Sequence, residues 1–127
     1  MPAPDLQDSF NVWLDGEMAR EPGPEIVGLH FFLAEPVIGW CIDISGSEQY
    51  SDTDPDWACE MDFPPGRSLN LSEEEVGSDW ETALESAKQL VRVYLDRPSQ
   101  GAERLKAATA IAIGFVDGDL HKLWPPP

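Results

Sequence analysis

The sequence has few of the residues on which most catalytic and metal sites depend. Its 127 residues include only two histidines and two cysteines. His30 and His121 lie on separate predicted strands, and no GxSxG, HExxH or phosphate-binding loop occurs. We therefore predict that the protein is not an enzyme and that it uses no cofactor.

Basic residues are also scarce. Eight lysines and arginines face 24 aspartates and glutamates, which gives a net charge of −16 and a pI near 4.1. Binding to phosphate groups requires a basic surface, so nucleic acids and anionic membranes are poor candidates as ligands. A basic surface on another protein is the partner that this charge favours.

Long apolar runs and an N-terminal signal are missing as well. The first residues, Met1-Pro-Ala-Pro-Asp, lack both the basic and the apolar region of a signal peptide. The longest apolar stretch, residues 26–44, is interrupted at Glu35-Pro36 before it could span a membrane. These features predict a cytoplasmic protein without a membrane segment. Cys41 and Cys59 are then expected to be free thiols rather than a disulfide.

The chain is long enough for one domain over residues 1–127 with a single core. Residues 1–8 are expected to be a loose lead-in and residues 125–127 a proline tail. Alternating apolar residues predict a first strand over residues 10–15 and a fourth over residues 57–63. The polar residues 45–56 between the central strands and this fourth strand are expected to form a long exposed loop.

The apolar stretch 26–44 predicts two paired strands around a four-residue loop at Glu35-Pro36. In the register that keeps the apolar side chains on one face, Phe31 lies opposite Trp40 and His30 opposite Cys41. The same register pairs Val27 with Ile44, Leu29 with Ile42, and Leu33 with Ile38.

One amphipathic helix is expected over residues 79–96. Its apolar side chains recur at three- and four-residue spacing, and Pro98 ends it. Two segments fit the capping-box spacing, Ser72 with Glu75 and Ser78 with Glu81.

Asp117-Gly118 is typical of a two-residue hairpin turn, which would pair Phe115 with Leu120 and Ile111 with Trp124. Together these elements predict an α+β fold. It would consist of an antiparallel sheet of about five to six strands, one long helix on one face, and a C-terminal β-hairpin.

Two chemical alternatives stay open at this stage. A small enzyme or metal site could use His30, Cys41 and Asp43. The segment Asp52-x-Asp54-x-Asp56 resembles the start of a calcium loop, but an EF-hand would need Gly at its sixth position and Glu at its twelfth. Trp57 and Phe63 occupy those positions.

Acidic residues are concentrated in the first two thirds of the chain. Residues 1–87 contain twenty acidic and two basic residues, whereas residues 88–127 contain four acidic and six basic ones. Such a surface can be merely solvated, but a basic partner would relieve its self-repulsion, and interleaved aromatic residues could anchor that partner. The predicted partner-binding residues are Glu48, Tyr50, Asp52, Asp54, Asp56, Trp57, Glu60, Asp62, Glu73 and Glu74.

The closing segment IAIGFVDGDLHKLW, residues 111–124, follows the helical pattern in a small acidic chain. In these respects the sequence resembles bacterial immunity proteins of polymorphic toxin systems, including the partners of type VI secretion and Rhs-type effectors. The resemblance implies a protein that binds a cognate toxin domain and neutralises it without catalysis. We expect the protein itself to be a monomer or weak dimer. The alternative is a non-enzymatic adaptor or chaperone-like module with a basic partner.

Overall fold

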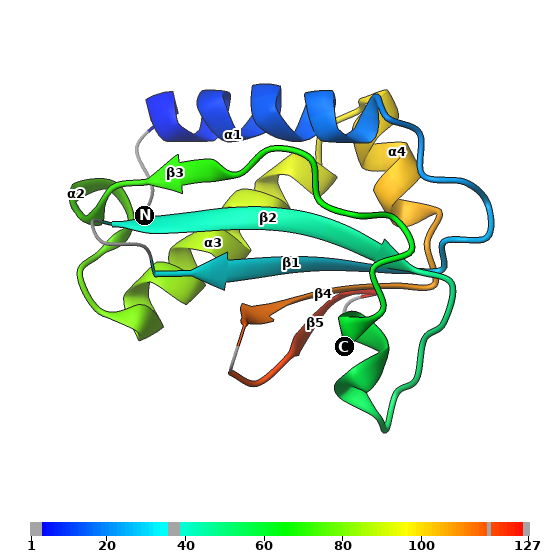
Figure 1. Cartoon of the computed structure of the whole chain (residues 1–127). Coiled ribbons are helices and arrows are strands. Elements are labelled where there is room, and N and C mark those ends of the chain that lie inside the picture. The colour runs from blue at the N-terminus through cyan, green and yellow to red at the C-terminus, as the bar shows by residue number, and fades with distance from the viewer. Residues whose placement is uncertain (1–3, 36–38, 117, 126–127) are drawn as a thin grey trace.

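The computed structural model describes residues 4–35, 39–116 and 118–125 (Figure 1). The expected loop at Pro36, the residues Ile38 and Asp117, and most of the proline tail lie outside this part of the chain. In order, the elements are α1 (Pro4–Met18), β1 (Gly28–Ala34), β2 (Trp40–Ser47), the 3-10 helix η1 (Pro55–Cys59), β3 (Leu69–Leu71), α2 (Glu73–Val76), α3 (Trp80–Leu95), α4 (Gln100–Lys106), β4 (Ala110–Phe115) and β5 (His121–Trp124).

Five strands form one mixed sheet in the order β3-β2-β1-β4-β5. The prediction of an α+β fold is confirmed, but the prediction of a purely antiparallel sheet is wrong, because β1 pairs in parallel with β4. The chain returns from β3 to β4 through α2, α3 and α4. This long crossover brings β4 beside β1 in the same direction.

Residues 4–18 form a helix, so the predicted lead-in is wrong from residue 4 onward and the predicted first strand is wrong. Leu6, Phe10, Leu14 and Met18 follow one another at four-residue spacing and are at most 3% exposed, whereas Val12 is 73% exposed. A strand would have placed Val12 on the same face as Phe10 and Leu14. The helical period instead places the four buried side chains on one stripe against the sheet.

Helix α3 carries the expected apolar stripe, but it is not the single long helix that was predicted. It has 16 residues against 15 in α1, and α1, α3 and α4 share the covering of the sheet (Figure 1). The Tyr94 hydroxyl on α3 donates a 2.6 Å hydrogen bond to Asp15 on α1. The two helices thus enclose the ring of Phe10, which lies 6.4 Å from that of Phe31 on β1.

Only one of the two predicted capping boxes forms. Ser72 and Glu75 cap α2 reciprocally, as expected. At α3 the N-cap is Asp79, whose side chain accepts from the Thr82 amide at 2.9 Å, so the Ser78–Glu81 box is wrong. A carboxylate one position later satisfies the same unpaired backbone donors.

The central hairpin has the predicted faces but a different register. Phe31 lies opposite Ile44 and Leu33 opposite Ile42, a shift of four residues from the predicted pairs. An even shift leaves every side chain on its own face, so the apolar set remains together. The ladder ends at the pair of Ala34 and Cys41.

Residues 57–63 do not form the predicted fourth strand. Pro55 opens η1, and Asp54 caps it by accepting from the Asp56 amide at 3.0 Å. The chain regains the sheet only at Phe63, which forms an isolated bridge with Gly46. Residues 45–47, which were expected in the loop, belong to β2.

The C-terminal hairpin is present as β4 and β5. Ile111 pairs with Trp124 as predicted, but an irregularity after Ile111 shifts the register, and the ladder ends at Ile113 and His121. The predicted Phe115–Leu120 pair therefore does not form. Within the described ranges, no helix combines the length and apolar character needed to cross a membrane.

Replacing Phe10 with alanine should test the corrected assignment of α1. Because Phe10 is fully buried between α1, α3 and β1, we expect Phe10→Ala to lower the free energy of unfolding by about 3–5 kcal/mol. Val12→Ala, two positions away but exposed, should change it by less than about 0.5 kcal/mol. Urea denaturation followed by circular dichroism measures both. Equal losses would contradict the helix.

Candidate functional site

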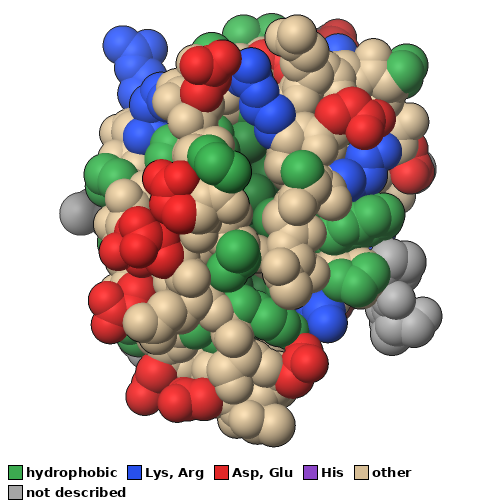
Figure 2. Space-filling model, turned by 90° about the vertical axis from the view of Figure 1, so that its right-hand side faces the viewer, with side chains coloured by type: hydrophobic (Ala, Val, Ile, Leu, Met, Phe, Trp, Pro, Cys, Tyr) green, Lys and Arg blue, Asp and Glu red, His purple; other side chains and the backbone are tan. Residues whose placement is uncertain are grey.

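The segment of residues 48–62, here named the acidic lobe, carries most of the predicted contact residues. It leaves the sheet after Ser47, the last residue of β2, and returns at Phe63. Six acidic side chains lie in it, all of them exposed, and it contains no lysine or arginine. These acidic residues are Glu48, Asp52, Asp54, Asp56, Glu60 and Asp62. Figure 2 views this end of the molecule, where acidic side chains gather along the left and lower parts of the surface.

The buried side chain of Trp57 packs on the sheet and holds the acidic lobe against it. It is only 6% exposed, so it is a supporting residue rather than the exposed anchor that was expected. Its ring lies against Gly28, where an added Cβ would be 2.5 Å from Cζ3. The rings of His30 and Tyr50 meet it edge-on, with centroids 6.4 and 5.2 Å away. Tyr50 is partly exposed and can contact a partner.

Hydrogen bonds inside the acidic lobe set its shape. The Asp62 carboxylate accepts from the Glu48 amide at 2.9 Å, and the Tyr50 hydroxyl donates to Asp52. This hydrogen bond and the nearby Lys122 ammonium, 3.4 Å away, lower the pKa of Asp52. The Asp52 carboxylate is therefore held in its charged form, and hydrogen bonds fix the backbone on either side of it.

Two of the ten predicted contact residues lie elsewhere. Glu73 and Glu74 belong to α2, which follows Leu71, and Leu71 pairs with Trp40 at the start of β2. The acidic lobe follows the other end of β2, so the length of the strand, roughly 20 Å, separates the two groups. Figure 1 shows α2 and the green turn of η1 at opposite ends of the sheet. The structure thus unites eight of the predicted residues and leaves two apart.

The open alternative of a His30–Cys41–Asp43 site gains no support from the geometry. His30 lies opposite Ser45 rather than Cys41, because of the four-residue shift in register. Burial raises the pKa of the Cys41 thiol, and the charge of Asp43 adds to this effect, so the thiol stays protonated. In the parts of the chain that the structure describes, no three His, Cys, Asp or Glu side chains are grouped to hold a metal ion.

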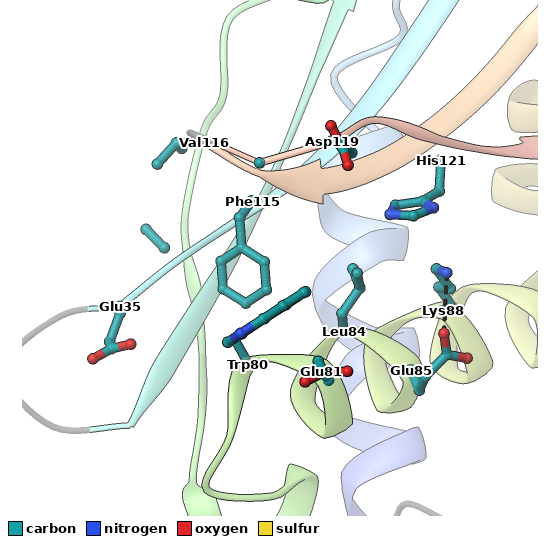
Figure 3. A pocket seen from close by; sticks show the side chains of 12 residues that line it. Glu35, Trp80, Glu81, Leu84, Glu85, Lys88, Phe115, Val116, Asp119 and His121 are labelled. Carbon is teal, nitrogen blue, oxygen red and sulfur yellow. Dashed lines mark hydrogen bonds and ion pairs between the residues drawn. The ribbon is translucent and has the colours of Figure 1, made fainter.

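A second surface feature was not foreseen from the sequence. A groove of about 960 Å³, here named the α3–hairpin groove, lies between the first half of α3 and the β4–β5 hairpin (Figure 3). Trp80 and Phe115 form its aromatic floor, and Trp80 is 56% exposed. Its lining comes from the end of β1, from α3 and from the hairpin. Trp80 continues the three- and four-residue spacing of the helix predicted over residues 79–96, so the sequence pattern groups it with the buried apolar side chains.

His30 should make stability depend on pH. Burial lowers its pKa from 6.5 to about 4, so the unfolded chain takes up a proton below pH 6.5 that the folded chain does not. Stability should therefore fall as the pH decreases from 6.5 to about 4. We expect the loss of unfolding free energy between pH 7 and pH 5 to be about 2 kcal/mol smaller in His30→Phe. Urea denaturation at both pH values measures this, and identical losses would contradict a buried neutral His30.

Comparison with known proteins adds nothing to this geometry. No model of a protein family matches the chain, and no curated protein or solved structure is significantly similar to it. The resemblance to immunity proteins therefore stays a prediction.

Proposed function

We propose that the protein is an immunity protein that binds the toxin domain of a bacterial effector and neutralises it without catalysis. The observation that supports this proposal is the acidic lobe: six exposed carboxylates on an ordered segment that contains no basic residue. A surface of this kind complements a basic cleft, such as those of enzymes that act on nucleic acids or nucleotides.

The charges and the apolar groups of the acidic lobe would have different roles. Long-range attraction by the carboxylates accelerates encounter with a basic cleft and weakens as salt increases. A slow dissociation requires apolar contact that excludes water. The partly exposed ring of Tyr50 and the 44% exposed side chain of Met61 offer such contact within the same segment.

Lys122 on β5 lies at the edge of the acidic lobe and neutralises part of its charge. Its ammonium lies 3.4 Å from Asp52 and 5.5 Å from the centre of the Tyr50 ring. A basic group of the toxin would displace or join this weak, exposed ion pair at little cost. Glu73 and Glu74, at the far end of the sheet, are not needed for this contact, so the proposal is restricted to the acidic lobe.

Neutralising three carboxylates should test the proposal. In Asp52→Asn, Asp54→Asn and Asp56→Asn combined, the asparagines can still accept the hydrogen bonds that shape the acidic lobe. We expect the association rate with the toxin domain that co-purifies with the protein to fall by at least about tenfold at low salt. Protection of a host that expresses this toxin should decrease in parallel.

The matched control removes three exposed carboxylates from other parts of the surface. Asp8→Asn, Glu25→Gln and Asp96→Asn change the net charge equally but leave the acidic lobe intact. This variant should bind and protect like the original protein. Equal protection by both variants would exclude the acidic lobe as the contact surface. Binding without any protection would favour the adaptor over the immunity protein.

A further inference from the structure

We propose that the α3–hairpin groove is a second protein-binding site, which holds a basic segment of a partner that inserts a bulky apolar side chain. This inference goes beyond the proposed function, since it concerns a different surface and does not depend on the partner being a toxin. It is supported by the aromatic floor of the groove and by the charges on its walls.

Aromatic rings in successive contact extend from the core to the floor of the groove. Trp40 is 3% exposed, and its ring meets that of Phe115 edge-on at 5.6 Å. On its other side, Phe115 meets the ring of Trp80 at 6.2 Å, again edge-on. Figure 3 shows Trp80 and Phe115 facing each other across the space between α3 and the hairpin.

Trp80 packs against Phe115 with only part of its side chain. It is the first residue of α3, where the capping is done by Asp79, and more than half of its surface is exposed to solvent. Val116, on the opposite wall, is 63% exposed. Large exposed apolar groups beside a groove are typical of binding sites, and Trp is the residue type most enriched among the anchors of interfaces.

The negative charges on the walls of the groove favour a basic occupant. Four acidic residues line it, Glu35, Glu81, Glu85 and Asp119, and all are exposed. Lys88 and His121 also line the groove, but the Lys88 ammonium is already paired with Glu85 at 3.1 Å and its side chain is only 12% exposed. A cationic segment would therefore gain ion pairs around an apolar contact.

The same charges argue against other occupants. A second copy of this chain carries a net charge of −16 and would bring a further acidic surface against these walls. Glu73 and Glu74 lie on α2, directly before α3, so they extend the negative charge at this end of the molecule.

Titration with a defined peptide tests this site. The probe is a short peptide in which lysines flank two adjacent leucines, and the readout is the NMR signal of the Trp80 indole together with the amides of Glu81 and Gly118. We expect saturable shifts at these three residues. A peptide with serines in place of the leucines should bind at least about tenfold more weakly.

Variants distinguish the groove from the acidic lobe. Trp80→Ala should weaken peptide binding at least about tenfold, judged by the shifts of Glu81 and Gly118, with only a small loss of thermal stability from the lost contact with Phe115. Val12→Ala, which removes an exposed apolar side chain from α1, and the asparagine triple variant of the acidic lobe should both bind the peptide normally. Shifts confined to Tyr50 and Asp52, equal binding of the serine peptide, or no saturation would each overturn the proposal. If the Trp80 signal shifted with protein concentration in the absence of peptide, the groove would be a self-association surface and the proposal would be wrong.

Discussion

The packing of β1 between two layers is the constraint on which the rest of the structure depends. One set of its side chains lies beneath α1 and α3, while Gly28 and His30 face Trp57 on the other side. The absence of a Cβ at Gly28 lets the indole ring lie directly on the strand. The acidic lobe therefore covers one end of the second face of the sheet through the buried Trp57, although its carboxylates are exposed.

Most of the basic side chains that form ion pairs lie on or beside the helices, so they do not neutralise the acidic residues elsewhere on the surface. Glu17, 6% exposed, accepts from Arg20 and from the backbone amides of Gly66 and Arg67. On α4, Arg104 and Lys106 pair with neighbouring carboxylates. Because the fold contains little positive charge near the acidic lobe, a basic partner would relieve a repulsion that folding itself leaves in place.

Local patterns in the sequence predicted which faces are buried, but not how distant segments meet. The apolar residues of β1 and β2 keep their faces because the register differs by an even number of residues. Phe10 and Leu14 fit both a strand and a helix, and only the wider spacing from Leu6 to Met18 separates the two. The parallel pairing of β4 follows from a long crossover, which no local pattern encodes. The acidic lobe was found by counting charges along the chain, whereas the α3–hairpin groove joins three separate segments.

The central claim is that the acidic lobe binds one dedicated basic partner, and affinity purification from the source cells at low and high salt tests it most directly. The claim predicts one stoichiometric partner with a toxin-like domain, identified by mass spectrometry. It should be captured far less by the asparagine triple variant at low salt, and the original protein should retain it in high salt because apolar contacts add to the charges. Many weakly held basic proteins, all lost in high salt, would contradict the claim and mark the acidity as a solvated surface.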